Sequence, residues 1–138
     1  MKKVYYLDTN ICIFYIRGKN IKLRDKINSI AKECIKLPAM VKAELLVGAE
    51  KSRRHDETLA ETLAFCEPYE IVPFDDSMVL TYARIKAALE LKGQKIGWND
   101  TIIAATVLSR NGVLVTNNTR EFIRIDGLML EDWTQEQP

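Results

Sequence analysis

Three carboxylates that are far apart in the sequence each lie close to a point where a strand or a short loop leads into a helix. Asp8 follows a short apolar run, Glu44 lies in a helical stretch after a second such run, and Asp100 opens a later helical stretch. In a parallel α/β sheet the carboxyl ends of the strands form the ligand crevice, so acids at these ends can converge. Because clustered anions require a cation, the sequence predicts one acidic, metal-binding crevice.

The chemistry that such a crevice favours is metal-assisted hydrolysis of a phosphodiester. Hard divalent cations such as Mg²⁺ and Mn²⁺ prefer carboxylate and water oxygens, and Mg²⁺ binds one or two carboxylates together with substrate phosphates. A bound ion can orient the phosphodiester, offset its charge and lower the pKa of the water that becomes the nucleophile. Three or four acids suffice for one ion or for a pair of ions.

Residues that competing mechanisms require are missing. His55 is the only histidine and lies in a basic stretch, which disfavours paired-histidine nuclease chemistry and histidine-rich zinc sites. The sequence contains neither GxxxxGK[ST] nor GxGxxG, the usual phosphate-binding motifs of nucleotide-binding proteins. The adjacent acids Asp75 and Asp76 precede a long helical pattern, and we interpret them as a helix cap rather than as a metal site.

Strand-like and helical patterns alternate along the chain. The interval 76–92 has apolar residues at helical spacing, with Gly93 at its end. Asn99 is predicted to cap a further helix that stops at Gly112, which places Asp100 in a first turn where the helix dipole favours the ionised carboxylate. This alternation predicts the α/β class, with a parallel sheet between layers of helices. Strands are expected at Lys3–Leu7, Cys34–Leu37, Glu70–Val72, Val113–Thr116 and about Leu128–Leu130.

The composition is that of an ordinary globular protein, with 138 residues, 47% of them hydrophobic and 28% charged. We expect a single domain over residues 1–138, because the chain shows no repeat, low-complexity tract or flexible linker. The apolar run before Asp8 is too short for a secretory signal, and no run reaches the length of about 18 apolar residues that suggests a membrane span. A cytoplasmic protein without membrane contact is therefore expected. Cys12, Cys34 and Cys66 are odd in number and widely spaced, which favours reduced packing residues.

The net charge of +1 does not by itself indicate a nucleic-acid-binding protein. Basic clusters at residues 51–55, 19–26 and 120–124 could contact phosphates, although solvated helix faces and loop ends are the more common role of such clusters. Tyr15, Trp98 and Phe122 could stack on RNA bases, but packing in or near a core is the more frequent role of aromatic residues at helical spacing.

Four short motifs occur together in one order along the chain: Leu7–Asn10, Ala43–Leu45 with Gly48, Gly97–Asp100 with Ile103–Ala105, and Val115–Asn118 with Glu121–Phe122. In these motifs the chain resembles PIN-domain proteins, specifically the VapC-type toxins of toxin–antitoxin pairs, over nearly its whole length. The resemblance implies a three-layer α/β/α sandwich with a central, mainly parallel sheet. It also implies a Mg²⁺- or Mn²⁺-dependent endoribonuclease, a homodimer, and inhibition by a cognate antitoxin.

The resemblance also assigns roles to individual residues. Asp8, Glu44 and Asp100 match the metal-binding acids of the family. At the fourth acidic position many relatives have aspartate two residues after the strand-end threonine, where this chain has Asn118, and Glu121 is the expected compensating acid. Hydroxyl and amide groups nearby could hold the carboxylates or their waters, and the candidates are Thr9, Asn10, Thr116, Asn117 and Asn118.

Each acid taken alone has a structural alternative. Asp8 could be no more than a cap of the helix that follows, Glu44 no more than a solvent-facing helix residue, and Asp100 no more than a first-turn acid. Two alternatives exist for the function of the whole chain. One is a DNA-directed nuclease of the same fold, and the other is a catalytically silent module that binds RNA or protein, which Asn118 leaves open.

The antitoxin implied by the resemblance has an expected footprint. Because the crevice is anionic, a basic residue of the antitoxin should lie near Asp8 and Asp100. The rest of the partner should cover apolar surface of the first helices, around Ile11, Phe14 and Ile30.

Overall fold

The computed structural model describes residues 2–135, and its centre is a five-stranded sheet with the order β3-β2-β1-β4-β5. Every neighbouring pair of strands is parallel. The central strands β1 and β4 are largely buried, because helices cover both faces of the sheet. The strands are Tyr5–Leu7 (β1), Ile35–Pro38 (β2), Glu70–Val72 (β3), Val113–Val115 (β4) and Met129–Glu131 (β5).

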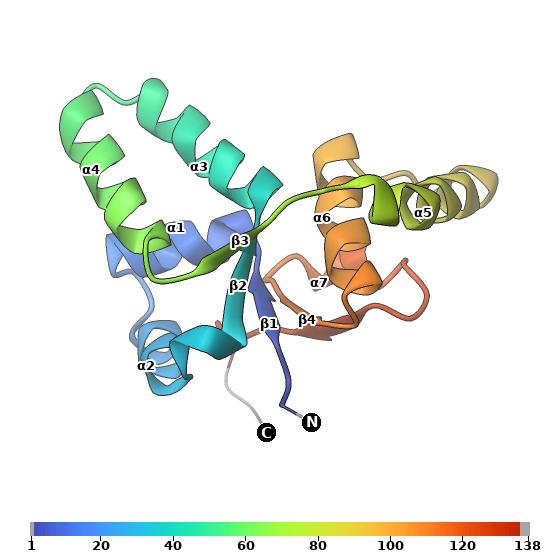
Figure 1. Cartoon of the computed structure of the whole chain (residues 1–138), viewed down its shortest axis with the longest axis horizontal. Helices are drawn as coiled ribbons and strands as arrows, with labels where there is room; N and C mark the ends of the chain where they lie inside the picture. The colour runs from blue at the N-terminus through green and yellow to red at the C-terminus, as the bar shows by residue number, and fades with distance from the viewer. Residues whose placement is uncertain (1, 136–138) are drawn as a thin grey trace.

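The helices form two layers around the sheet. Helices α1 to α4 lie on one side of the strands and α5 to α7 on the other (Figure 1). The chain moves outwards from β1 through β2 to β3 and then returns across the sheet to β4, so right-handed crossovers place the later helices on the opposite face. The predicted α/β class with a parallel sheet between helices is confirmed. The helices are α1 (Thr9–Arg17), α2 (Ile21–Ser29), α3 (Ala39–Glu50), α4 (His55–Cys66), α5 (Val79–Leu91), α6 (Trp98–Ser109) and α7 (Thr119–Phe122).

All five predicted strands are present, with ends shifted by no more than two residues. The first helix begins at Thr9, directly after Asp8. Asp8 has an extended backbone, and its side chain accepts a hydrogen bond from the Thr9 amide, so it caps α1. The acid is thereby fixed at the carboxyl end of the central strand.

The helical pattern predicted for residues 76–92 is confirmed, with a 3₁₀ turn at Asp76–Met78 before α5. Asp75 accepts hydrogen bonds from the amide and the hydroxyl of Ser77, which supports the interpretation of this acidic pair as a cap. Gly93 follows α5 with a positive φ of 68°, the usual backbone state of a helix-ending glycine.

The predicted limits of α6 are wrong at both ends. The helix begins at Trp98, so Asn99 is its second residue and does not cap it. Gly97 precedes the helix without a side-chain cap, and Asp100 lies in the first turn as expected. The helix ends at Ser109, before the predicted stop at Gly112.

Gly112 has a packing role instead. A Cβ atom at this position would lie 2.4 Å from Cε1 of Tyr6 and 3.3 Å from the carbonyl oxygen of Val4. The Tyr6 side chain belongs to the core and is almost fully buried, so it has little room to move. The turn before β4 can therefore approach β1 only because residue 112 has no side chain.

We expect Gly112→Ala to lower the free energy of unfolding by about 1–3 kcal/mol, the usual cost of overpacking a filled core. Gly48→Ala is the matched control, because a Cβ at Gly48 would have no neighbour within 4 Å. Gly48 lies in α3, where alanine is favoured over glycine by about 0.5–1 kcal/mol, so the control should be stabilised. Urea unfolding of both variants measures the difference, and a Gly112→Ala protein as stable as the wild type would contradict the close approach.

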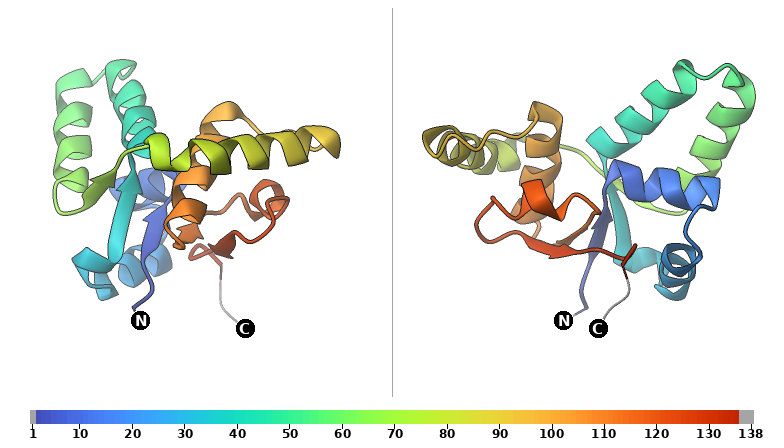
Figure 2. Two further views of the ribbon diagram at one scale, coloured as in Figure 1. Left: turned by 45° about the vertical axis from the view of Figure 1, so that its right-hand side comes forward. Right: turned by 180° about the vertical axis from the view of Figure 1, so that it is seen from behind.

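The topology directs the functional crevice to the end of β1. The chain continues from β1 to β2 on one side, whereas β4 pairs with β1 on the other, and ligands of open α/β sheets bind where the strand order reverses in this way. Helices α3 and α6 stand on either side of the carboxyl end of β1 (Figure 1, and from behind in Figure 2). Side chains from the end of β1, from α3, from α6 and from the segment after β4 can therefore meet.

Candidate metal centre

Asp8 is held at the end of β1 by hydrogen bonds to both of its carboxylate oxygens. Oδ1 accepts from the backbone amide of Thr9 at 2.8 Å, and Oδ2 accepts from the Thr116 hydroxyl at 2.8 Å. The side chain is 6% exposed. Burial raises the pKa of Asp8, the two hydrogen bonds oppose that rise, and the charge of Glu44 adds to it. The carboxylate is therefore fixed in orientation but is a costly buried anion in the absence of a cation.

Glu44 projects from α3 and is also held at both oxygens. Oε1 accepts from the Thr9 hydroxyl at 2.7 Å, and Oε2 accepts from the side-chain amide of Asn99 at 2.6 Å. Thr9 therefore binds two acids at once, Asp8 through its backbone amide and Glu44 through its hydroxyl. These contacts tie the starts of α1 and α6 to the middle of α3.

Asp100 lies in the first turn of α6, where the charges of the other three acids act on it. The pKa of Asp100 is raised to about 6, first by burial and then by the negative charges of Asp8, Glu44 and Glu121. Within residues 2–135 no lysine, arginine or histidine forms an ion pair with any of these four acids. The crevice thus gathers negative charge that the described part of the chain leaves unbalanced.

Glu121 and Asn118 are joined to this cluster from the segment after β4. The side-chain amide of Asn118 donates to Oε2 of Glu121 at 2.9 Å. The backbone amide of Asn118 donates to the Thr116 hydroxyl at 2.9 Å, and that hydroxyl in turn donates to Asp8. The asparagine at the fourth acidic position thus positions the nearby glutamate and is linked to Asp8 through Thr116.

The donor set fits a hard divalent cation, because it consists of carboxylate oxygens without a thiolate or an imidazole. In residues 2–135 no three histidine, cysteine, aspartate or glutamate side chains already converge on a single point as metal ligands would. Asp8, Glu44 and Glu121 are each turned to a neutral hydrogen-bond donor, and the Asp100 carboxylate has no hydrogen bond with a described residue. A cation bound among these acids would offset the repulsion that raises the pKa of Asp100.

Most of the predicted site residues are brought together. Asp8, Glu44, Asp100 and Glu121 influence one another electrostatically, and three of the five predicted supporting residues, Thr9, Thr116 and Asn118, donate hydrogen bonds within the cluster. The other two, Asn10 and Asn117, are exposed and form no side-chain hydrogen bond with the acids in the described part of the chain.

Asn99 is the site residue that the sequence analysis missed, because its polar side chain was assigned to a helix cap. The available signal was Gly97, two residues earlier. A Cβ atom on Gly97 would lie 2.9 Å from Oδ1 of Asn99, so the glycine leaves room for this side chain. The φ of Gly97 is −59°, which any residue adopts, so space rather than backbone conformation requires the glycine.

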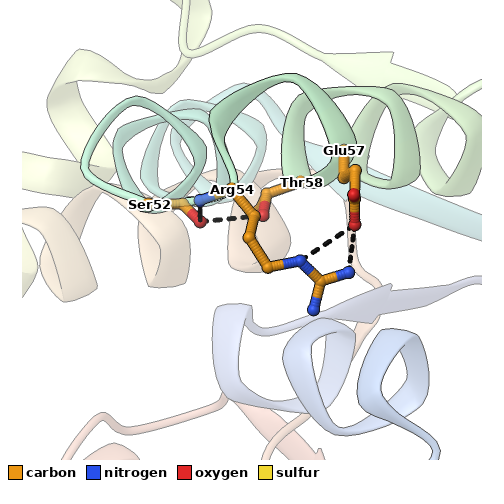
Figure 3. Close-up of polar contacts among 4 residues, drawn as sticks. All are labelled: Ser52, Arg54, Glu57 and Thr58. Atoms are coloured by element: carbon orange, nitrogen blue, oxygen red, sulfur yellow. Dashed lines mark hydrogen bonds and ion pairs between the residues drawn. The ribbon is translucent and has the colours of Figure 1, made fainter.

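In the basic cluster at residues 51–55, Arg54 and His55 have acidic partners. The Arg54 guanidinium binds Glu57, and the Ser52 and Thr58 hydroxyls are 2.9 Å apart (Figure 3). His55 lies 3.1 Å from Glu50 and 3.0 Å from Asp56. These contacts favour a structural role for Arg54 and His55 over phosphate binding.

The cysteines are free, and Cys12 and Cys66 are buried, as expected of packing residues. Burial raises the pKa of the Cys12 thiol well above its usual value, which makes it a poor metal ligand. Phe122 is fully buried, whereas Trp98, the first residue of α6, is 62% exposed. Core packing is therefore confirmed for Phe122, and Trp98 lies at the surface.

Comparison with known proteins agrees with this geometry. The family model described as the PIN domain matches residues 5–128. The chain is 38% identical to the tRNA(fMet)-specific endonuclease VapC of Shigella flexneri, with 94% of this chain and 98% of the relative covered. It is 37% identical to ribonuclease VapC2 of Rickettsia felis over the same shares of the two chains.

Solved structures give the same result. The complex of VapBC2 from Rickettsia felis bound to a promoter DNA fragment contains a chain that superimposes with a TM-score of 0.89 at 35% identity, covering 94% of this chain and 98% of that one. DNA-bound VapBC from Salmonella typhimurium contains a chain that matches with a TM-score of 0.89 at 36% identity, covering 96% and 99% of the two chains.

Proposed function

Because this chain belongs to the PIN-domain family, within its VapC-type ribonucleases, we propose that it is the Mg²⁺- or Mn²⁺-dependent toxin of a type II toxin–antitoxin pair. The activity that follows from the family is that of an endoribonuclease, and PIN-domain nucleases generally use divalent metal ions. The observation in this chain that supports a metal-dependent reaction is the gathering of Asp100 with three further acids at the end of β1, without a cationic partner among residues 2–135.

We assign Asp8, Glu44 and Asp100 as the metal-binding acids and Glu121 as the fourth acid. When bound there, Mg²⁺ or Mn²⁺ would lower the pKa of a coordinated water and offset the charge of the phosphodiester. The residues of the chain orient the reacting groups. Thr9 and Thr116 fix the Asp8 carboxylate, and Asp100 contributes the least restrained carboxylate of the set. The hydrogen bond from Asn118 restrains Glu121.

Cleavage of RNA by the purified chain tests this function. We expect turnover with Mg²⁺ or Mn²⁺ and none in EDTA, with RNA cleaved in preference to DNA of the same sequence. The initiator tRNA is a suitable first substrate, because the Shigella flexneri relative is named for it. Equal cleavage of DNA would favour the DNA-directed alternative, and metal-independent binding of RNA without cleavage would favour the silent module.

The fourth acidic position gives a separate prediction. We expect Glu121→Gln to weaken Mn²⁺ binding and RNA cleavage more than Asn118→Ala does, because only Glu121 supplies a charge and Asn118 acts by positioning it. Loss of a positioning contact usually costs about 10–100-fold in metal affinity or activity, so Asn118→Ala should also have a measurable effect. Titration calorimetry gives the ranking, and the reverse order would assign the role at this position to the amide.

The partner we propose is a cognate antitoxin, because the matching structures are of VapBC complexes. The footprint expected around the first helices needs one correction. Ile11 is fully buried in the core and cannot be part of an interface, whereas Phe14 and Ile30 are partly exposed. A basic residue of the antitoxin near Asp8 and Asp100 remains the expected contact, since it would balance the charge of the crevice.

We further propose a single domain over residues 1–138, a homodimer and a cytoplasmic location. One sheet includes strands from both ends of the described chain, which supports a single domain. No helix within residues 2–135 is long and apolar enough to cross a membrane. The three free cysteines suit a reducing compartment, where RNA is also found. Light scattering on the purified chain tests the dimer.

A further inference from the structure

We infer that Asn99 is a positioning residue that holds the Glu44 carboxylate in place for metal binding, an inference that rests on the proposed metal-dependent function. The side-chain amide of Asn99 lies 2.6 Å from Oε2 of Glu44, and the two residues are 55 positions apart in the sequence. The contact joins the second residue of α6 to the middle of α3. It crosses between the two helices that stand on either side of the end of β1 (Figure 1).

Two separate donors fix the orientation of the Glu44 carboxylate. Glu44 is held from both sides, since Thr9 donates to Oε1 and Asn99 donates to Oε2. Both donors are uncharged, so they restrain the carboxylate without neutralising it, and its negative charge stays available to a cation. A lysine or arginine in the place of Asn99 would instead compete with a metal ion for the same oxygens.

Local structure places Asn99 for this role. The start of α6 at Trp98 puts Asn99 one residue before Asp100, so one helical turn presents a metal-binding acid and the amide that restrains another. Gly97 gives the amide its space, because a Cβ atom there would approach Oδ1 of Asn99 to 2.9 Å. A helix-capping role for Asn99 is excluded by its position inside the helix and by the direction of its side chain toward Glu44.

Asn99→Ser removes this contact with little change to the helix, because serine at the second position is too short to reach Glu44. We expect the Kd for Mn²⁺ to rise by about 10–100-fold, as for other residues that orient metal ligands. Turnover should fall at limiting Mn²⁺ and recover at higher Mn²⁺, with the KM for RNA unchanged. Gln94→Ala is the matched control, because it truncates an exposed amide in the loop before α6, outside the crevice.

A double-mutant cycle distinguishes positioning of Glu44 from a direct or merely structural effect. If Asn99 acts through Glu44, Asn99→Ser should raise the Kd for Mn²⁺ in the wild type but not further in a Glu44→Gln background, where Asp8 and Asp100 still bind the ion. An equal increase in both backgrounds would overturn the inference, as would an unchanged Kd in the single variant. Asn99→Ala provides a second truncation should the serine variant fold poorly.

The contact itself can be measured without a metal. In EDTA the side-chain amide protons of Asn99 should shift in NMR spectra when Glu44 is changed to glutamine, and the Gln94 side-chain signals should not. An Asn99 signal that does not respond to this change would overturn the inference. A wild-type chain that shows the contact but binds no Mn²⁺ would instead contradict the proposed function.

Discussion

Asp8→Asn, Glu44→Gln and Asp100→Asn should each lower metal-dependent RNA cleavage by about 100-fold or more, since even residues that only support metal ligands cost about 10–100-fold. Each change removes one negative charge from the crevice and keeps the shape of the side chain. These charges act on one another, since burial and the charges of Asp8, Glu44 and Glu121 raise the pKa of Asp100 to about 6. Removing one therefore weakens the field that attracts a cation. Initial rates at saturating Mg²⁺ or Mn²⁺ measure the loss.

The three variants should fold, because the hydrogen bonds around the acids can adapt. In Asp8→Asn the amide oxygen can still accept from the Thr9 backbone, and the Thr116 hydroxyl can rotate to accept from the new amide. In Glu44→Gln the Thr9 hydroxyl can rotate in the same way while Asn99 continues to donate. Circular dichroism checks the fold of each variant.

The matched control for these substitutions is Glu90→Gln, which makes the same chemical change on the exposed surface of α5. It should cleave RNA at the wild-type rate. If one of the three crevice variants also retains that rate with an unchanged circular dichroism spectrum, its acid is not part of the metal site. If all three retain it, the reaction does not use this crevice.

Sequence reasoning could locate the acids because their positions depend on simple geometry. Strands in a parallel sheet end at the same edge, so an acid directly after a strand, as at Asp8, lies at that edge. A helix that leads back into the next parallel strand, as α6 leads into β4, begins at the same edge, which places a first-turn acid such as Asp100 there as well. The sheet itself was predictable because its strands are short apolar runs separated by helical patterns. These features are local in sequence and need no knowledge of side-chain contacts.

Contacts between distant side chains could not be predicted in the same way. A shift of one residue in the start of α6 moves Asn99 from a capping position to the second helical residue, and its side chain then reaches Glu44. Helix α1 is apolar on most sides, so its sequence does not show which face packs inward, and Ile11 was expected at a surface although it is fully buried. The pairing of Asn118 with Glu121 likewise depends on the short turn of α7.

Divalent metal should strongly stabilise the protein, and Asp100→Asn should reproduce part of that effect in EDTA. A ligand present at 100 times its Kd stabilises a fold by about 2.7 kcal/mol, which corresponds to about 10 °C in Tm for a domain of this size. Millimolar Mg²⁺ or Mn²⁺ should therefore raise the Tm of the wild type. Asp100→Asn removes the acid that the other three repel, so it should raise the Tm of the metal-free protein and reduce the metal-induced increment.

The Tm difference between Asp100→Asn and the wild type in EDTA should depend on pH, and the direction follows from the pKa of Asp100. The value is about 6 in the folded chain and near the ordinary 3.8 in the unfolded chain, so between these values the folded state binds more protons. The contribution of Asp100 to the free energy of unfolding is therefore present at low pH and is lost as the pH rises from about 4 through about 6. Asp8, whose pKa is also raised, contributes in the same direction.

In EDTA the Tm advantage of Asp100→Asn over the wild type should be largest above about pH 7 and should shrink toward about pH 4, where the wild-type acid is protonated and resembles asparagine. Protons and metal compete for the same carboxylate, so the metal-induced rise in Tm of the wild type should also diminish below about pH 6. Calorimetric scans across this pH range measure both trends. A wild-type Tm that is insensitive to metal, together with a lower Tm for Asp100→Asn in EDTA, would show that Asp100 is chiefly a helix-start acid, and would favour the silent binding module over the nuclease.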